Sequence, residues 1–521
     1  MMSDTHRGYD AIVIGSGFGG AFAAHALVNA GWRVLMLERG DWVPRGPHNQ
    51  AVDGTLDHTP FYSRETPYQG IEGSQTPVFG SASCVGGGSV FYGGVSLRLR
   101  PADFLPKPEI ADGLRWPFGY AELAPHYDTV ERLLEVAGLA GSDPHEPPRQ
   151  DGYPQAAAPL GETSAMIAAA GRRLGLSPFP LPLAIHYGND RRGCQLCPTC
   201  DTFACAFSAK NDLATTLIPA ALRRGLELRT STVATRLVER DGRVVAVEAI
   251  DKRAGARVRF EGANVILAAG ALASPHLLMA SGLVDKNPAA DAVGRFLTRH
   301  CNGIAVGVFP RLPDRGLRFH KQIGFHDFYF GHPNGGSPRG KLGAIQQLQT
   351  PPIALVRDHA PRWTWPLLNH AVPHTTGLLV LAEDQPRREN GLSIDGRRSD
   401  VFGLPQLVVR HRYTERDRAA RAALLREARR ILWAAGARFF YTYHIKTFSH
   451  AAGTLRCGED PRSAPLDPAC RFRGLANLFV TDGSFMPTPG GVNPSLTIAA
   501  NALRVAEGLA QGTLPPIEGA G

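Results

Sequence analysis

The first forty residues alternate between apolar runs and a helical stretch. Residues 9–14 form a short apolar run rich in β-branched side chains, which is typical of a strand buried in a parallel sheet. The Ala-rich residues 21–27 predict a helix that ends at Gly31, because glycine readily takes the left-handed conformation after a helix. Residues 33–37 predict a second strand, which delivers Glu38 at its carboxyl end. The pattern therefore predicts a strand–helix–strand unit.

Three glycines join the first strand to the helix. Gly15, Gly17 and Gly20 have the spacing G-x-G-x-x-G, in which the first permits a tight turn, the second lets the backbone approach a pyrophosphate and the third lets the helix pack on the strand. The helix N-terminus offers unpaired N–H groups and the positive end of its dipole to the phosphates. Glu38 lies where an acidic side chain accepts hydrogen bonds from ribose hydroxyls. Together these features predict a dinucleotide-binding site.

The middle of the chain mixes helical patterns with many short strands. Apolar residues recur at helical spacing over residues 116–138 and again over 163–174. A buried strand over 264–270 leads to a helix that starts near Ser274, where Ser can cap the helix and the following Pro suits its first turn. Further short strands are predicted at residues 226–230, 234–238, 244–250 and 256–260.

Residues 301–436 follow a different pattern from the strand–helix–strand unit at the front of the chain. Residues 301–413 combine short strands, Pro-Gly turns and aromatic residues, which favours an antiparallel sheet. A long helix comes next, with Thr414 and Asp417 forming a capping-box-like start and Gly436 marking its end. This region predicts a unit separate from the first.

The C-terminal segment returns to the character of the first unit. A buried strand over residues 477–484 ends in an acid and a glycine, Asp482 and Gly483. A helix over residues 495–509 follows, with Asn493 as its predicted N-cap and Pro at its first position. The two ends of the chain are therefore expected to share one nucleotide-binding unit.

Composition and charge narrow the classes of function. At 521 residues the chain is long enough for two domains, and its 43% hydrophobic and 20% charged residues are ordinary for a soluble globular protein. The formal net charge is +9, but the basic residues are dispersed, which argues against a nucleic-acid-binding stripe. The first strand begins too early for a secretory signal, and no window of 18 residues is apolar enough to span a membrane. We therefore expect a cytoplasmic protein.

Two further runs carry candidate chemistry. Residues 84–94 hold three adjacent glycines among Val, Phe and Tyr, which indicates backbone that passes close to a flat or anionic group. Residues 194–205 hold four cysteines at C-x2-C-x2-C-x4-C spacing, close to that of ferredoxin runs that bind iron–sulfur clusters. No second paired group follows at zinc-site spacing, so buried thiols and a labile disulfide are alternatives, and no metal ligand is assigned.

Four stretches together resemble the GMC (glucose–methanol–choline) oxidoreductase family of flavoproteins. They span almost the whole chain, and the C-terminal one is specific in order and spacing. The resemblance is to the cholesterol-oxidase-like and bacterial dehydrogenase branch, in which Asn stands at the position of Asn493. The stretches are residues 15–38, residues 86–94, segments within residues 270–300, and segments within residues 450–494.

The resemblance implies an α/β fold (α+β overall) with two domains. One is a Rossmann-like FAD-binding domain assembled from separated segments, and the other is a substrate domain with a mostly antiparallel sheet. The FAD-binding domain is expected over residues 1–105, 205–300 and 451–521, and the substrate-binding domain over residues 106–204 and 301–450.

The resemblance also implies FAD in the front site and oxidation of an alcohol to a carbonyl by hydride transfer to flavin N5. His450 is the expected base, since its pKa suits removal of a hydroxyl proton. Asn493 is its expected partner, which hydrogen-bonds the alcohol oxygen without adding charge. The electron acceptor is expected to be O2, a quinone or a redox protein. The residues expected to contact FAD are Gly15, Gly17, Gly20, Glu38, Gly87, Ser89, Val233, Ala269, Gly270, Asp482, Gly483 and Asn493.

Departures from the family pattern refine these expectations. Relatives with covalently bound flavin carry a His near Phe91, so FAD is expected to be noncovalent, and Tyr92 stands where many relatives have a flavin-contacting Asn. The aromatic residues that favour an apolar or ring-shaped substrate are Phe325, Phe328, Tyr329 and Trp365. Two alternatives stay open. One is an iron–sulfur electron-transfer flavoprotein subunit that uses residues 194–205, and the other is a nucleic-acid-associated flavoprotein, prompted by the pI of about 9.2.

Overall fold

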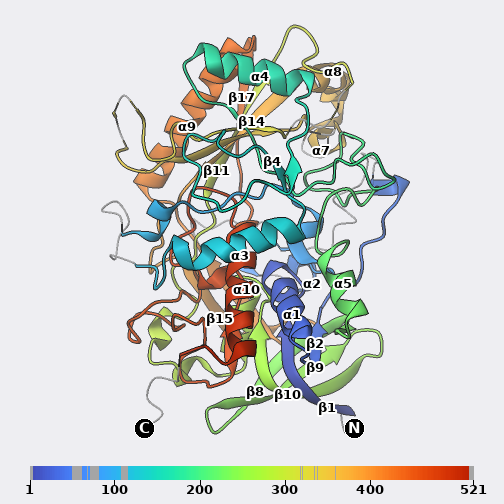
Figure 1. Ribbon diagram of the computed structural model, residues 1–521, viewed down its shortest axis with the longest axis vertical. Coiled ribbons are helices and arrows are strands. Elements are labelled where there is room, and N and C mark those ends of the chain that lie inside the picture. The colour runs from blue at the N-terminus through green and yellow to red at the C-terminus, as the bar shows by residue number, and fades with distance from the viewer. Residues whose placement is uncertain are drawn as a thin grey trace.

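Two large sheets lie at opposite ends of the molecule (Figure 1). In this computed structural model a seven-stranded sheet occupies one end, and a six-stranded sheet covered by helices occupies the other. The structure describes residues 4–49, 62–66, 68–70, 81–106, 115–316, 318, 321–333, 335–336, 338–351, 353–357 and 360–515.

The seven-stranded sheet is assembled from three separated parts of the chain. Its strands are β1 (Asp4–Ile14), β2 (Val34–Leu37), β7 (Glu227–Arg229), β8 (Thr232–Arg240), β9 (Arg243–Asp251), β10 (Ala256–Leu267) and β18 (Leu478–Val480). Their order is β7-β2-β1-β10-β9-β8, and β18 pairs with the carboxyl end of β10. The strands β7, β2, β1, β10 and β18 are parallel, whereas β8, β9 and the first part of β10 are antiparallel. The carboxyl ends of the parallel strands meet at one edge, where ligands bind in such sheets.

The predicted strand–helix–strand unit at the front of the chain is confirmed. Ile12 and Val13 of β1 are fully buried, as the apolar run requires. Helix α1 (Phe18–Asn29) starts after Gly17 and is followed by Gly31, whose φ of +85° is the left-handed conformation expected there. The helices that lie with α1 at this end are α5 (Leu217–Arg223), α6 (Ala273–Ala280) and α10 (Ser495–Gln511).

The six-stranded sheet is antiparallel throughout, as predicted for residues 301–413. Its strands are β6 (Phe179–Pro180), β11 (Cys301–Val308), β12 (Ile323–Phe325), β13 (Gly343–Leu348), β14 (Thr375–Ala382) and β17 (Phe439–His444), in the order β17-β11-β14-β13-β12-β6. One face packs on α4 (Glu162–Arg173) and α9 (Glu415–Ala434). Thr414 and Asp417 form the predicted capping box of α9. The other face is turned toward the seven-stranded sheet (Figure 1).

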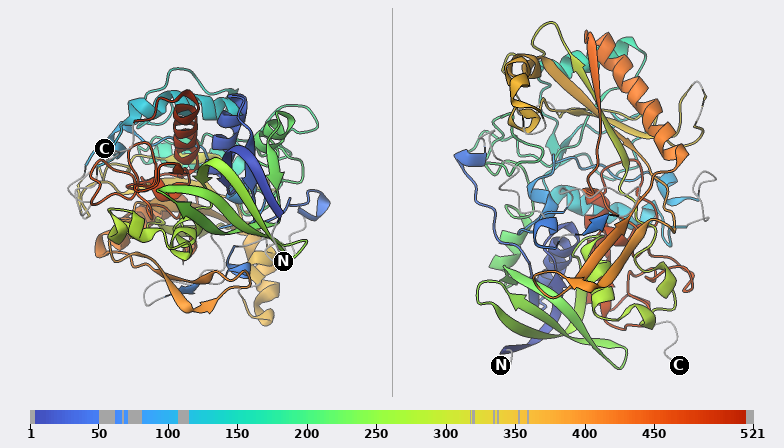
Figure 2. Two further views of the ribbon diagram at one scale, coloured as in Figure 1. Left: turned by 90° about the horizontal axis from the view of Figure 1, so that it is seen from below. Right: turned by 180° about the vertical axis from the view of Figure 1, so that it is seen from behind.

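Smaller elements join the two ends. Strands β15 (Gly391–Ser399) and β16 (Pro405–Arg410) form a hairpin, and β3 (Gln69–Gly70) pairs with β16 to complete a three-stranded sheet. Strand β15 packs on α6 (Figure 2). Helix α3 (Tyr120–Leu133) packs on α10. The remaining elements are α2 (Tyr62–Glu65), β4 (Ala137–Gly138), β5 (Gln155–Ala156), α7 (Ile353–Arg357) and α8 (Trp365–Ala371). The domain boundaries stay a prediction, and both β15 and α3 belong to the segments predicted for substrate binding.

Three local predictions are corrected by the structure. The strands predicted at 256–260 and 264–270 are one strand, β10, because pairing with β1 continues through Gly262. Helix α6 starts at Ala273, and Ser274 does not cap it, because the Ser274 hydroxyl donates to Asp482 instead. Helix α10 has Pro494 as its N-cap, so Asn493 precedes the helix and its side chain is free for another partner.

Candidate active site

The three glycines at the junction of β1 and α1 have different surroundings. Gly15 has a φ of +101°, and a Cβ there would lie 2.4 Å from the carbonyl oxygen of Ala268. A Cβ on Gly20 would lie 1.9 Å from the carbonyl oxygen of Gly15, so glycine is needed for α1 to pack on the turn. A Cβ on Gly17 would meet open space. Gly15 and Gly20 are thus required by the fold itself, whereas Gly17 borders space that a ligand can fill.

Glu38 is held at the carboxyl end of β2 by backbone and hydroxyl donors. Its Oε2 atom accepts hydrogen bonds from the backbone N (3.1 Å) and the hydroxyl (2.5 Å) of Ser16, and its Oε1 atom accepts from the backbone N of Gly40 (2.8 Å). Burial raises the pKa of Glu38, while these hydrogen bonds lower it. Next along β8, Val233 follows Thr232, whose backbone N donates to the Glu38 carbonyl (2.9 Å). The predicted ribose acceptor is therefore a fixed, buried carboxyl.

The glycine loop lies directly on the G-x-G-x-x-G turn. Gly86 and Gly87 have φ values of +88° and +53°, and a Cβ on Gly87 would lie 3.1 Å from the Cα of Gly17. The Ser89 hydroxyl donates to the Gly86 carbonyl (2.6 Å), and the backbone N of Gly86 donates to the Ser16 hydroxyl (3.0 Å). Ser16 thus links the loop to Glu38. The sequence reasoning missed Ser16, which occupies the variable position between two of the glycines.

The ends of β10 and β18 meet beside this turn. Ala269 and Gly270 follow β10 and are half-buried, and a Cβ on Gly270 would meet open space. The Asp482 carboxylate accepts from the backbone N of Gly270 (2.9 Å) and the backbone N of Ser484 (2.9 Å). Burial raises the pKa of Asp482, and these hydrogen bonds oppose the rise. Gly483 has no room for a side chain, since a Cβ would lie 3.0 Å from the Ala451 carbonyl.

His450 and Asn493 both lie where loops from the two ends of the molecule meet. His450 is half-buried, and its Nδ1 atom lies 2.9 Å from Nδ1 of His300, while His300 Nε2 lies 3.0 Å from the Gly490 carbonyl. Asn493, in the same loop as Gly490, accepts through Oδ1 a hydrogen bond from Nε2 of Gln346 (2.7 Å) on β13. Burial lowers the pKa of His450 well below 6.5, with further lowering from His300 and Lys321. His450 is therefore a neutral imidazole that is linked through His300 to Gly490, in the loop that also carries Asn493.

Comparisons with known proteins identify the family of the chain. Two family models, both described as GMC oxidoreductase, match residues 9–302 and residues 386–502. The chain belongs to the GMC oxidoreductase family. It is 32% identical to paromamine 6'-oxidase from Streptomyces fradiae, over 97% of this chain and 92% of that protein.

Other GMC relatives confirm the predicted branch and fold. The chain is 26% identical to a cholesterol oxidase from Mycobacterium tuberculosis, over 96% of this chain and 90% of that protein, and bacterial dehydrogenases are also among its relatives. The crystal structure of pyridoxine 4-oxidase from Mesorbium loti has a similar fold, with a TM-score of 0.68, 20% identity, and coverage of 96% of this chain and 98% of that one. The chain is thus an oxidoreductase of a family whose members act on alcohol groups.

GMC oxidoreductases bind FAD, and the residues at the front site fit this cofactor. Open space borders Gly17 and Gly270, beside the N-terminus of α1, which can bind a pyrophosphate. Glu38 places a buried carboxyl at the end of β2 for the ribose. The predicted cofactor residues come from separate stretches of the chain, and those at the ends of β1, β2, β10 and β18 meet at the carboxyl edge of the parallel strands. The cofactor is therefore FAD.

Sequence reasoning missed Gln346 and Asp384, and it missed the contact that His300 makes with His450. His300 directly precedes β11, and Gln346 lies within β13, where their patterns are those of ordinary strand residues. Asp384 follows β14 and accepts hydrogen bonds from the backbone N atoms of Arg299 and His300 (both 2.9 Å). His300 was visible as part of the family motif, but nothing in its neighbourhood indicates a contact with His450. Only the pairing of the strands brings these residues together.

The four cysteines of residues 194–205 form no metal site in the described part of the chain. All four are free thiols that line one small, mostly apolar pocket, and no group of three or more His, Cys, Asp or Glu side chains among the described residues is arranged to hold a metal ion. Lys210 anchors the loop instead, since its Nζ donates to the carbonyls of Tyr92 (2.9 Å) and Phe203 (2.7 Å). The iron–sulfur alternative therefore gains no support from the structure.

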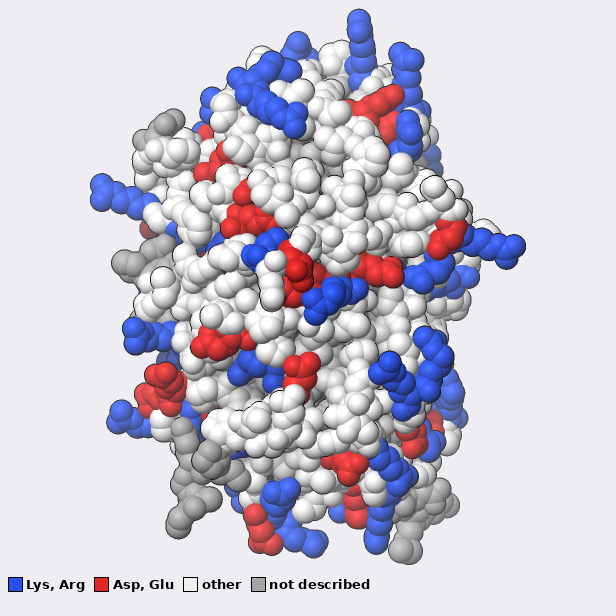
Figure 3. Space-filling view, viewed as in Figure 1, with Lys and Arg blue, Asp and Glu red and all other residues white. Residues whose placement is uncertain are grey.

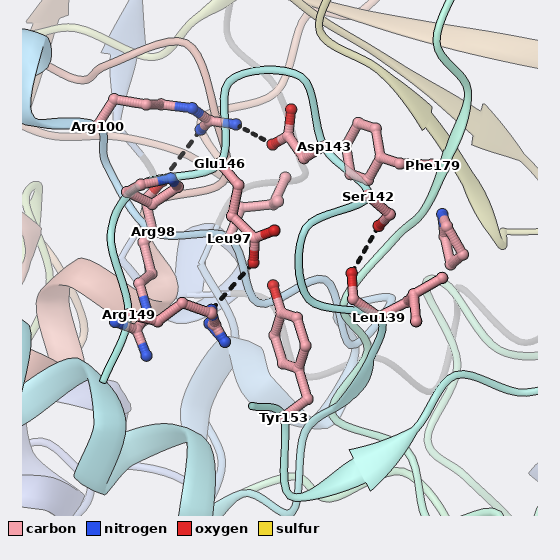
Figure 4. Close-up of a pocket in the computed structure, with 12 residues that line it drawn as sticks. Leu97, Arg98, Arg100, Leu139, Ser142, Asp143, Glu146, Arg149, Tyr153 and Phe179 are labelled. Atoms are coloured by element: carbon pink, nitrogen blue, oxygen red, sulfur yellow. Dashed lines mark hydrogen bonds and ion pairs between the residues drawn. The ribbon is translucent and has the colours of Figure 1, made fainter. Parts of the chain in front are cut away.

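A small polar pocket is lined by residues of the segments 97–100 and 139–153 (Figure 4). Three arginines line it, and each is paired with carboxylates of the same chain. Arg100 pairs with Asp143 (2.9 Å), Arg149 with Glu146 (3.0 Å), and Arg98 with Glu131 and Asp128 (both 2.6 Å). Each of the three guanidinium groups is thus paired within the protein. Asp143 and Glu146 belong to the pocket lining, whereas Glu131 and Asp128 do not.

Surface charge and helix length bear on partners and location. On the face shown in Figure 3, basic and acidic side chains are interspersed and the coloured residues form no continuous basic patch, so the nucleic-acid alternative gains no support there. Among the described helices, none combines the length and the apolar character that crossing a bilayer demands. The cytoplasmic location stays a prediction.

Proposed function

We propose that this GMC oxidoreductase oxidises an alcohol to a carbonyl, with His450 as the base and Asn493 as the group that orients the alcohol. FAD supplies the hydride acceptor, flavin N5. The observation that carries the proposal is the state of His450, a neutral imidazole whose Nδ1 is occupied by His300. Among the described residues its Nε2 has no hydrogen-bond partner, so that atom is available for a substrate hydroxyl. Phe91, which offers no nucleophile, supports noncovalent FAD.

Asn493 is held so that its amide N–H groups are free for the substrate. Its Oδ1 atom accepts from Gln346, so its Nδ2 donors remain for the alcohol or carbonyl oxygen. Helix α10 starts two residues later and directs the positive end of its dipole toward this loop, which favours negative charge at the site. The pair of a proton acceptor and a neutral donor is what removal of a hydride and a proton from a carbinol requires.

Replacing Asn493 with Ala should slow flavin reduction about tenfold, because one hydrogen bond of about 1.4 kcal/mol to the reacting oxygen is lost. The measurement is the anaerobic rate of flavin bleaching by substrate in a stopped-flow instrument. Asn369→Ala, at an exposed position of α8, is the matched control and should bleach like the wild type. An unchanged rate in Asn493→Ala would remove Asn493 from the site.

Two amide side chains on one face of the six-stranded sheet favour a polar alcohol as substrate. Of the four aromatic residues that favoured an apolar or ring-shaped substrate, Phe325, Phe328 and Tyr329 are fully buried, and Trp365 is half-buried in α8. Gln346 and Asn302 lie on the same face of the sheet, by the pairing of β13, β14 and β11. The Oε1 atom of Gln346 and the Oδ1 atom of Asn302 are buried and have no hydrogen-bond partner among the described residues. Such groups cost free energy unless water or a ligand satisfies them.

An anaerobic bleaching screen tests the proposed function. Sugars, amino sugars, sterols, aryl alcohols and aliphatic alcohols are each mixed with the FAD-loaded protein, and flavin absorbance is followed. We expect sugars and amino sugars, the polar alcohols of this panel, to bleach the flavin fastest, and paromamine, for which the relative paromamine 6'-oxidase is named, belongs in the screen. Faster bleaching by sterols would contradict the polar-substrate proposal. No bleaching by any alcohol, in protein that contains FAD, would contradict alcohol oxidation.

A further inference from the structure

His300 lies against His450 in a geometry that fixes the hydrogen positions of both rings. The two Nδ1 atoms are 2.9 Å apart and the rings are nearly perpendicular, at 88°. We infer that His300 is a positioning residue that holds His450 in the tautomer with its lone pair on Nε2, directed at the substrate. This inference rests on the proposed role of His450 as the base.

His300 itself is rigidly held. Its backbone N donates to Oδ1 of Asp384 (2.9 Å), and its carbonyl accepts from the hydroxyl of Tyr413 (2.8 Å). Its φ of +61° is in the left-handed region, which few side chains adopt without such restraints. The side chain is 1% exposed. The ring therefore has one orientation to offer to His450.

The partner of His300 on its other side decides the tautomer. Nε2 of His300 lies 3.0 Å from the carbonyl oxygen of Gly490, and a carbonyl only accepts, so Nε2 carries the hydrogen. Burial lowers the pKa of His300, so its ring is neutral and Nδ1 is left with a lone pair. Two lone pairs cannot share the 2.9 Å contact, so Nδ1 of His450 must donate. Nε2 of His450 is then the unprotonated nitrogen.

Charged groups around the pair act in both directions. Asp384 and Glu383, near His300, favour a proton on its ring, but burial outweighs them. Lys321, which pairs with Asp201, disfavours a proton on His450. When Nε2 of His450 accepts the hydroxyl proton, its Nδ1–H still points at the lone pair of His300, so the hydrogen bond between the rings is kept. The hydrogen-bonded pair of His300 and His450 thus contains no carboxylate in direct contact with the base.

Two variants of equal size test the inference. Asn and Asp both tolerate a positive φ, and each places an oxygen near the position of His300 Nδ1. In His300→Asp the carboxylate should raise the pKa of His450, so the acidic limb of the flavin-reduction rate should move by about one pH unit or more to higher pH relative to His300→Asn. His300→Leu, which has no acceptor, should reduce the rate at least tenfold. All three should retain FAD, which flavin absorbance reports.

A merely structural role for His300 predicts a different outcome. It would lower the rate of flavin reduction equally in His300→Asn and His300→Asp, and the rate of both variants would fall at the same acidic pH. That result would overturn the inference. A second readout needs no turnover. In 15N-histidine-labelled protein, the His450 signals, identified by their absence in His450→Ala, should show an unprotonated Nε2 and a protonated Nδ1. The reverse assignment would also overturn the inference. Unaltered flavin reduction in His450→Ala would instead refute the proposed function itself.

Discussion

Replacing His450 with Ala should slow reduction of the bound flavin by substrate about 10²–10⁴-fold, which is the range that a positioned general base contributes. The physical reason is that the hydride leaves the carbinol carbon readily only when the hydroxyl proton has an acceptor. His450 is the neutral acceptor, because its Nδ1 is engaged by His300 and its Nε2 has no partner in the described part of the chain. Stopped-flow bleaching under anaerobic conditions measures this step directly, without interference from the electron acceptor.

The pH dependence and a matched histidine make this prediction specific. Burial disfavours the imidazolium and lowers the pKa of His450 well below 6.5, so the wild-type rate should be flat at neutral pH and fall only in acid. His450→Ala should lack this acidic limb. His444→Ala, at an exposed position at the end of β17, should keep both the rate and the limb. Loss of rate in both variants would point to damage to the sheet rather than to loss of the base.

Elements built from local patterns could be predicted from the sequence. The structure of residues 9–38 could be predicted from apolar runs and glycine spacing, which are local in the sequence, and the structure agrees with the prediction closely. The capping box of α9 is similarly local. The joining of two predicted strands into β10 could not be seen, because Gly262 resembles a break and only pairing with β1 keeps it extended.

Only those residues of the candidate site could be predicted whose residue type and position in the sequence match a family pattern. His450 and Asn493 were found through the family pattern, but the helix-cap role given to Asn493 is wrong, since its Oδ1 is bound to Gln346. His300 and His450 are 150 positions apart, and their contact depends on how residue 300 enters β11 and how the loop after β17 returns to it. No local property of either segment encodes that distance.

Replacing Gly17 with Ala should weaken FAD binding about 10²–10⁴-fold and leave the fold intact. Gly17 has a φ of −69° and a ψ of −169°, which Ala adopts without strain, and the added methyl group meets only open space in the protein. In the loaded enzyme that space is where we expect the pyrophosphate to approach the turn. Displacing it from two backbone donors costs about 1.5–3 kcal/mol each, which gives the expected loss of affinity. Titration of the flavin-free protein with FAD, followed by flavin fluorescence, measures it.

Gly20→Ala adds the same methyl group three residues later and should fail in a different way. Its Cβ would lie 1.9 Å from the carbonyl oxygen of Gly15, a backbone atom that cannot move without disturbing β1. This variant should lose thermal stability as well as FAD, although Ala is the better helix former by about 1 kcal/mol. The two variants separate ligand binding from folding. The methyl group of Gly17→Ala would displace the pyrophosphate, whereas that of Gly20→Ala would displace the backbone of Gly15. If Gly17→Ala bound FAD as tightly as the wild type, the pyrophosphate could not lie against Gly17.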